Sequence, residues 1–281
     1  MQLLQQRDFS QFFSDTFKFI KENGKHFFTN YFIINGIFLI LQFVKNYYTG
    51  QLVVFPALVE FLYLVLILVF SVVNYTFVSI YMILYNERGT NFNYMDIIAY
   101  YKENAGKIAI FILMSIIIAI PAGIVFYIVL LLSLITIVGP FLVYAAFVVW
   151  FSMAFYEYLF TNKGVTDCFG YAWTLLTKKF WAITGSTALL FLIIIVIFGF
   201  MMSLTGVFSS FADMNNTDPL GNIQKIQQAF FSPVTLVVTT FFTVFMVTLQ
   251  ITQGIIYFSQ KELLENISAN NEIDQIGKIE F

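Results

Sequence analysis

A long stretch without any charge constrains this chain more than any other feature. From Ile108 to Tyr156 the sequence contains no Asp, Glu, Lys, Arg or His. A helix that crosses a bilayer needs about 20 apolar residues, so this stretch is long enough to cross, turn and cross again. The chain is 59% hydrophobic and 11% charged, whereas soluble domains carry about 25% charged residues. The sequence therefore predicts an all-α membrane protein, because the ~10-residue alternating strands of a membrane barrel are missing.

Apolar segments of spanning length recur along the chain, and we expect six transmembrane helices. Proline in the third segment, Pro121, predicts a kink, and Gly139-Pro140 predicts a break before the fourth. Together the segments predict one membrane domain over residues 1–262 and a polar cytoplasmic tail over 263–281. The six segments cover residues 27–45, 58–82, 107–131, 137–160, 180–206 and 233–259.

A repeated phrase suggests how these segments are organised. "DTFKFIKENGK" begins at Asp15, "DIIAYYKENAGK" begins at Asp96, and a looser copy begins at Asp167. Each copy precedes two apolar segments, so we expect three parallel repeats, each an amphipathic interfacial helix followed by a transmembrane hairpin. The repeats cover residues about 8–86, 90–162 and 165–260.

Short segments with apolar residues at helical spacing begin each repeat. They are too polar to span, and they predict amphipathic helices at the membrane surface. The first covers residues 8–21, the second covers 93–103, and the third starts at Thr166. Asn93 and Thr166 are the predicted N-caps, because their side chains can accept a hydrogen bond from the first turn.

The distribution of basic residues predicts the orientation. Only Lys45 and Lys225 lie on the side opposite the surface segments, while the other twelve lysine and arginine residues share the side of both termini. Cytoplasmic loops carry an excess of Lys and Arg, so we expect both termini to be cytoplasmic. The twelve are Arg7, Lys18, Lys21, Lys25, Arg88, Lys102, Lys107, Lys163, Lys178, Lys179, Lys261 and Lys278.

Amide side chains within the apolar segments form the first candidate site. Asn35, Asn74, Gln250 and Gln253 cannot face lipid cheaply, so they should point into the bundle. Two interpretations stay open. The amides form interhelical hydrogen bonds that fix the packing, or they line a polar cavity or path.

Lysines on the surface segments form the second candidate site. Lys21, Lys102 and Lys178 lie on different repeats, and each lysine near an anionic leaflet contributes about 1 kcal/mol. Either they form one cytoplasmic platform for anionic lipid or a protein partner, or they only anchor the orientation.

Acidic residues carry weaker signals. Asp15, Asp96 and Asp167 could form a metal or proton site, but carboxylates also stabilise the first turn of a helix, and we favour that structural role. Glu60 lies either deep in the second span or, as we favour, at the outer interface. We expect Glu157 to extend toward Lys163.

The 207–232 segment is the longest one predicted outside the membrane. In it Ile223, Ile226 and Phe230 predict a short helix that dips into the outer leaflet.

The chain lacks the residues that most catalytic and metal sites need. It has one histidine, His26, and one cysteine, Cys168, with no HExxH, paired-cysteine or P-loop motif. We therefore expect no enzymatic activity and no cofactor. The net charge of −2 gives no reason to expect nucleic acid, so the expected partners are membrane lipids and a further membrane or cytoplasmic protein.

The pattern "RDFSQFFSDTFKFIKENGKHFF" and "VTDCFGYAWTLLTKKFWAI" resembles a group of bacterial membrane proteins. The group includes the membrane domain attached to some glycerophosphoryl diester phosphodiesterases. The hydrolytic barrel of those enzymes is missing here. Similar proteins also carry a β-carotene 15,15′-monooxygenase label, but that chemistry needs iron held by several histidines. The resemblance implies a fold and a bacterial inner membrane location, and it implies no catalytic residue.

These observations predict a non-catalytic scaffold, accessory subunit or module that organises lipid or a partner. The alternative is a small transporter or permease for an amphiphile or small solute, and an enzyme acting on lipid is third. A polar cavity would favour the transporter, and a dry, packed bundle would favour the scaffold.

Overall fold

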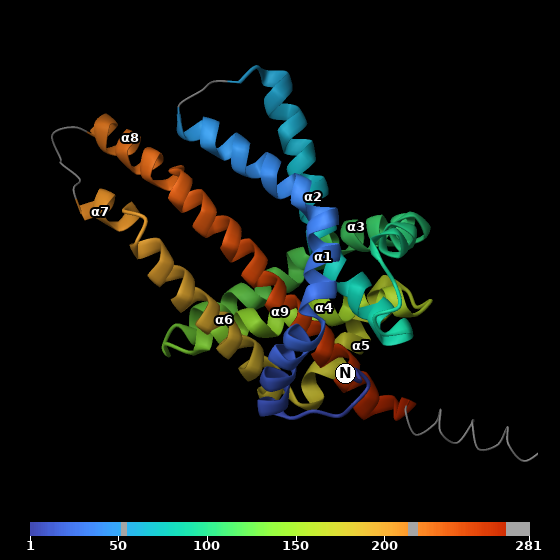
Figure 1. The fold of residues 1–281 in the computed structure, drawn as a ribbon. Helices are drawn as coiled ribbons and strands as arrows, with labels where there is room; N and C mark the ends of the chain where they lie inside the picture. Colours follow the sequence, from blue (N-terminus) through green and yellow to red (C-terminus); the bar gives the residue numbers. More distant parts are fainter. Residues whose placement is uncertain (52–54, 213–218, 268–281) are drawn as a thin grey trace, which may run out of the picture. The chain divides into compact units, whose positions relative to one another are not determined.

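A computed structural model describes residues 1–51, 55–212 and 219–267, and the described residues fold into helices without any strand (Figure 1). Six of these helices, α1, α2, α3, α4, α6 and α9, are long and apolar enough to cross a membrane. This confirms the predicted fold class, so the chain is an all-α, multi-pass integral membrane protein. The helices are α1 (Phe9–Gly50), α2 (Ala57–Arg88), α3 (Tyr94–Ser133), α4 (Gly139–Phe160), α5 (Val165–Lys178), α6 (Phe180–Ser203), α7 (Val207–Ala212), α8 (Pro219–Phe230) and α9 (Pro233–Glu265).

Helices α1 and α3 are longer than a membrane span. They contain 42 and 40 residues, or roughly 63 and 60 Å at about 1.5 Å per residue, against a hydrocarbon core of about 30 Å. Each joins a predicted surface segment to the following span without a break, whereas the sequence pattern predicts two separate helices. Only the third surface segment is separate, because the backbone leaves helical geometry at Lys179, between α5 and α6.

The repeated Lys-Glu-Asn phrase lies at the junction of surface segment and span in both unbroken helices. The Nδ2 of Asn23 donates to the carbonyl of Phe19 at 3.3 Å, and the Nδ2 of Asn104 donates to that of Tyr100 at 3.0 Å. Both amides therefore bond back onto their own helix, and the nearby glycines cost only about 1 kcal/mol each. The two copies share this detail, while the three-repeat architecture stays a prediction.

The predicted helix starts are half right. Asn93 caps α3 in a capping box, since its side chain accepts from the Met95 amide at 2.7 Å while Asp96 accepts from the Asn93 amide at 2.8 Å. Thr166 is not a cap, because α5 begins one residue earlier and Gly164 precedes it in extended geometry.

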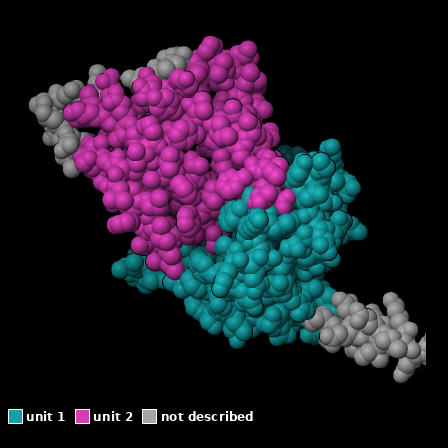
Figure 2. Space-filling model, in the orientation of Figure 1, with its two compact units in different colours: residues 1–28, 77–191, 249–281 teal, residues 29–76, 192–248 magenta. Residues whose placement is uncertain are grey.

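The chain forms two compact units (Figure 2). Unit 1 consists of residues 1–28, 77–191 and 249–281, and unit 2 consists of residues 29–76 and 192–248. Helices α1, α2, α6 and α9 each contribute one part to both units. The single domain over 1–262 stays a prediction, as does the tail over 263–281, of which residues 268–281 lie outside the described residues.

The last half of α9 is the centre of unit 1. Every residue from Ile251 to Glu262 is buried, although this stretch includes several polar side chains. Thr252 shares a hydrogen bond of 2.9 Å with Thr16 of α1, and a methyl group on Gly254 would lie 2.6 Å from the Tyr156 hydroxyl of α4. The helix is therefore surrounded by its neighbours within the unit.

Aromatic contacts join the helices of unit 2. Phe38 of α1 stacks on Phe70 of α2 with ring centroids 5.6 Å apart, and Phe198 of α6 lies against Phe242 of α9 at 4.2 Å. Phe230 of α8 meets α7 edge to face. The Thr235 hydroxyl of α9 donates to the carbonyl of Ala229 of α8 at 2.7 Å, so the end of α8 lies beside the start of α9.

Candidate functional site

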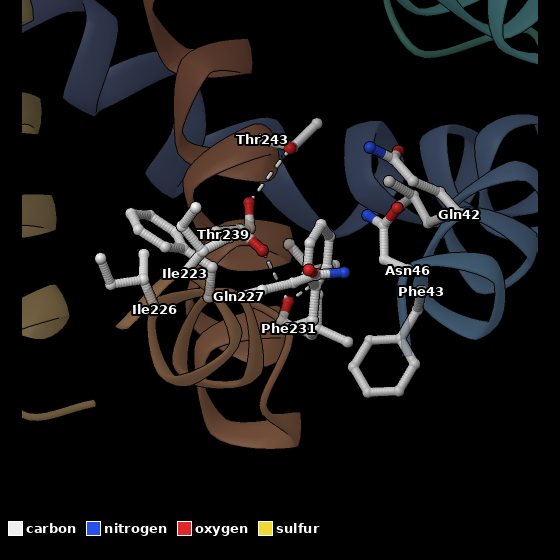
Figure 3. A pocket seen from close by; sticks show the side chains of 13 residues that line it. Gln42, Phe43, Asn46, Ile223, Ile226, Gln227, Phe231, Thr239 and Thr243 are labelled. Carbon is white, nitrogen blue, oxygen red and sulfur yellow. Dashed lines mark hydrogen bonds between the residues drawn. The ribbon is translucent and has the colours of Figure 1, made fainter. Parts of the chain in front are cut away.

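A cavity of about 490 Å³ lies in unit 2 between α1, α8 and α9 (Figure 3). Its volume is within the range of ~300–1,000 Å³ that is typical of ligand pockets. The polar lining consists of Gln42, Asn46, Gln227, Thr239, Thr240 and Thr243. The apolar lining consists of Leu39, Phe43, Ile223, Ile226, Phe230, Phe231 and Leu236.

Helix α1 presents one face to the cavity. Leu39, Gln42, Phe43 and Asn46 follow each other at spacings of three and four residues, which places them on one side of a helix. Figure 3 shows the amides of Gln42 and Asn46 across the cavity from α9. This wall can both donate and accept hydrogen bonds, because an amide carries two donors and an acceptor oxygen.

Helix α9 contributes three hydroxyl groups. Thr239 and Thr240 donate to the carbonyl of Leu236 at 3.0 and 2.8 Å, and Thr243 donates to the carbonyl of Thr239 at 3.1 Å. These bonds occupy the hydroxyl hydrogens within the helix. The hydroxyl oxygens keep acceptor capacity, so this wall can accept hydrogen bonds from a bound molecule.

Helix α8 supplies the most apolar wall and closes the cavity against α1. Ile223, Ile226 and Phe230 all line it, which confirms the short helix predicted around these three residues. The Nε2 of Gln227 donates to the carbonyl of Thr49, near the end of α1, at 3.3 Å.

The cavity lining carries no charged side chain, and few charged side chains lie elsewhere in the described part of unit 2. Within the described part of unit 2 the charged side chains are Lys45, Glu60 and Lys225. The Lys45 ammonium lies 3.0 Å from the Glu60 carboxylate and over the rings of Phe55 and Tyr63, 4.5 and 5.1 Å from their centroids. Glu60 is thus paired in the first turn of α2, while its depth in a membrane stays a prediction.

The four predicted amide residues are divided between the units, and the cavity lining consists of other residues. In unit 2, Asn74 accepts a hydrogen bond of 2.7 Å from the Tyr31 hydroxyl, which joins α1 to α2. Asn35 is fully buried, and its Oδ1 has no hydrogen-bond partner among the described residues. In unit 1, Gln253 is buried and the buried Oε1 of Gln250 also lacks a described partner. Asn74 therefore matches the packing interpretation, and a shared polar face stays a prediction.

A buried ionic network lies in unit 1. The fully buried Glu157 carboxylate accepts hydrogen bonds from Lys163 at 2.7 Å, Tyr257 at 2.7 Å and Lys261 at 2.8 Å. The predicted partner Lys163 is confirmed. The carboxylate is buried instead of reaching the surface, because α9 brings Lys261 to it from 104 residues away. No local pattern in the sequence could have predicted that partner.

The network continues along α5 and α9. Lys261 also lies 3.3 Å from Glu265, and the Tyr171 hydroxyl donates to the same carboxylate. Burial, followed by this hydrogen bond, raises the pKa of the Tyr171 hydroxyl well above its ordinary value. Two cations, Lys163 and Lys261, face the carboxylates of Glu157 and Glu265, so the charges of the network balance. The network links α4, α5 and α9.

The three repeated aspartates have separate local roles. Asp15 pairs with the buried Arg7 at 2.7 Å, Asp96 completes the cap of α3, and Asp167 lies in the first turn of α5. Within the described ranges no group of three His, Cys, Asp or Glu side chains is placed to hold a metal ion. These roles match the structural interpretation of the aspartates.

The predicted lysine platform and the cysteine both belong to unit 1. Lys21, Lys102 and Lys178 are exposed, and in the part of the chain that the structure describes none of them forms an ion pair. Whether they act as one platform stays a prediction. Cys168 is fully buried, and burial raises the pKa of its thiol to about 11.

The fold and the cavity define a class: a multi-pass, all-α membrane protein with a neutral, amphipathic cavity in one of its two units. Comparisons with protein-family models, curated proteins and solved structures found no match.

Proposed function

We propose that this protein is a non-catalytic membrane module that binds an amphiphilic molecule in the cavity of unit 2 and thereby organises lipid. The observation that carries the proposal is the cavity itself, whose walls differ in polarity. Amides and hydroxyls face it from α1 and α9, while α8 presents isoleucine and phenylalanine. A molecule with a polar headgroup and an apolar chain satisfies both walls, and membrane lipids are the abundant source of such molecules.

A substitution that fills the cavity tests this function. Thr243→Phe places a ring where a bound molecule would lie, and Thr243 is on the lining wall of α9. We expect the parent protein to retain an amphiphile through purification and the variant to retain at least about tenfold less, which corresponds to a loss of about 1.4 kcal/mol. Native mass spectrometry of the purified protein measures the retained mass.

The matched control adds the same bulk elsewhere on α9. Val234 is 59% exposed and is not among the lining residues, so Val234→Phe should retain the amphiphile as the parent does. Equal retention by the Thr243→Phe variant, or a parent protein that carries no amphiphile, contradicts the proposal.

A transporter is the second candidate, and one observation favours it. Asn35 lies four residues before Leu39 and therefore on the α1 face that lines the cavity, and its buried Oδ1 lacks a described partner. Within unit 2 this face of α1 extends the polar lining by one helical turn beyond the cavity, as a transport path would require. Net movement of a bound probe across proteoliposome membranes would separate a transporter from a static binding module.

We further propose a bacterial inner membrane location with both termini cytoplasmic, supported by the bias in basic residues. Gln224 of α8 and Asn162 between α4 and α5 are both exposed, and they are predicted on opposite sides. In a Cys168→Ala background, an impermeant thiol reagent applied to intact cells should label Gln224→Cys and leave Asn162→Cys unlabelled. Permeabilised cells provide the control, since both cysteines should then react. Labelling of only Asn162→Cys in intact cells overturns this topology.

A further inference from the structure

We infer that the cavity of unit 2 selects uncharged amphiphiles whose headgroups carry hydroxyl groups, and that the Lys45–Glu60 ion pair maintains this selectivity. The inference rests on the proposed binding function and assigns its ligand class and a specificity-determining residue.

The lining offers hydrogen bonds without charge. Its polar groups are the amides of Gln42, Asn46 and Gln227 and the hydroxyl oxygens of three threonines. A hydroxyl group on a ligand can donate to a threonine oxygen and accept from an amide nitrogen. The lining contains no cation that could form the charge-assisted hydrogen bonds by which proteins recognise phosphate.

Two lysines nevertheless adjoin lining residues: Lys225 of α8, which directly precedes Ile226 and is exposed, and Lys45 of α1. Lys45 directly precedes the lining residue Asn46, and its ammonium donates to the Thr49 hydroxyl at 3.2 Å. The backbone carbonyl of that same Thr49 accepts the hydrogen bond from Gln227 of the lining. Lys45 is therefore separated from a lining side chain by a single residue.

Glu60 compensates this cation. Its carboxylate lies 3.0 Å from the ammonium, and the Lys45 side chain is only 14% exposed, whereas that of Glu60 is 48% exposed. An anionic headgroup in the cavity would meet a lysine whose charge is already paired. It would also lose its hydration without a compensating charge in the lining, which is costly. An uncharged headgroup avoids both penalties.

Removing only the carboxylate charge should therefore change the preference. In Glu60→Gln the ammonium of Lys45 keeps its position beside the cavity but loses its counter-charge. An anionic headgroup then gains an attraction that falls off with distance and with the local dielectric constant, while an uncharged headgroup gains nothing comparable.

Two probes that differ by one phosphate test this directly. The full chain is placed in phosphatidylcholine nanodiscs and mixed with equal amounts of 1-oleoylglycerol and 1-oleoylglycerol 3-phosphate, and native mass spectrometry measures the ratio bound. Nanodiscs matter, because alkyl glycoside detergents are themselves uncharged, hydroxylated amphiphiles and would compete. Thr243→Phe defines the binding that occurs outside the cavity.

We expect the parent to favour 1-oleoylglycerol by about tenfold. Glu60→Gln should reduce that ratio by about tenfold or more. The double variant Lys45→Met, Glu60→Gln has no charge at either position and should restore the parental ratio. Lys45→Met alone leaves the carboxylate and should favour the uncharged probe at least as strongly as the parent does.

Each outcome bears on one part of the inference. A parent that binds the phosphate probe equally well or better overturns the ligand class, whatever the variants do. An unchanged ratio in Glu60→Gln overturns the role of the ion pair, and so does a double variant that behaves like Glu60→Gln. If Glu60→Gln binds neither probe, the Lys45→Met variant tests the role of the ion pair. A shift of its binding ratio toward the phosphate probe also overturns the role of the ion pair. If the Thr243→Phe variant binds both probes as well as the parent does, the proposed function itself is contradicted.

Discussion

Replacing Glu157 with leucine should destabilise the protein by about 3 to 5 kcal/mol, the range for removal of one partner from a buried ion pair. The variant deprives Lys261 of its closest anion at 2.8 Å and Tyr257 of its acceptor at 2.7 Å. Lys261 is only 4% exposed and retains Glu265 at 3.3 Å. Two lysines, Lys163 and Lys261, then face one carboxylate, so the positive charge of the buried network is no longer balanced.

The single cysteine provides the measurement. The thiol of Cys168 is buried in α5 and its pKa is raised to about 11 by burial, so it is protonated and unreactive near neutral pH in the folded protein. Unfolding of unit 1 exposes it to a fluorogenic thiol reagent. The midpoint of this reaction during heating should fall by several degrees in Glu157→Leu relative to the parent.

A double variant distinguishes a lost charge balance from a lost contact. In Glu157→Leu, Lys261→Met the buried cation is removed together with its partner, and apolar replacement of a whole buried pair is often neutral. We expect it to recover most of the lost stability. A single variant as stable as the parent would show that this network does not stabilise unit 1.

Replacing Gly50 with alanine should destabilise unit 2 by about 1 to 3 kcal/mol, as overpacking does in a filled core. Gly50 ends α1 where the chain meets the junction of α8 and α9. A methyl group there would overlap the Cβ of Phe231 and approach its carbonyl oxygen to 3.2 Å. Both atoms are fixed to the backbone, so relief requires a shift of the segment that carries the cavity residue Phe231.

The reporter for unit 2 is a cysteine at Val247, which is 1% exposed, in a Cys168→Ala background. Heating should expose this thiol at a lower temperature when Gly50→Ala is added. Gly36→Ala is the matched control on α1, because nothing beyond its chain neighbours and the adjacent backbone of its own helix lies within 4 Å of the added methyl group. That change should be neutral or stabilising by up to about 1 kcal/mol, since alanine is the better helix former. Similar effects of the two substitutions would contradict the close approach at Gly50.

Several structural features follow from the sequence alone, because they depend on local composition. The charge-free stretch from Ile108 to Tyr156 requires membrane spans, and the six apolar segments correspond to the six long helices. Asn93 caps α3, and the spacing of Ile223, Ile226 and Phe230 marks α8, since caps and amphipathic spacing act within a few residues.

The lengths of α1 and α3 show the limit of local patterns. The surface segment and the span of each repeat differ in composition, and this difference predicts two separate helices in place of α1 and two in place of α3. The backbone nevertheless stays helical, because neither junction contains a proline or a glycine with positive φ. By contrast, α5 ends at Lys178 and the backbone leaves helical geometry at Lys179, although no proline or glycine there predicts a break.

Only the tertiary structure decided which polar residues form sites. The cost of amides in lipid predicts a site at Asn35, Asn74, Gln250 and Gln253, but polarity does not specify which helix a side chain faces. The cavity instead combines groups from α1, α8 and α9, from Leu39 to Thr243 along the chain. The counter-charge of Glu157 likewise comes from α9. Such long-range pairs depend on how the helices pack against one another. Local sequence patterns predict where each helix lies in the chain, but they do not show which other helices it contacts.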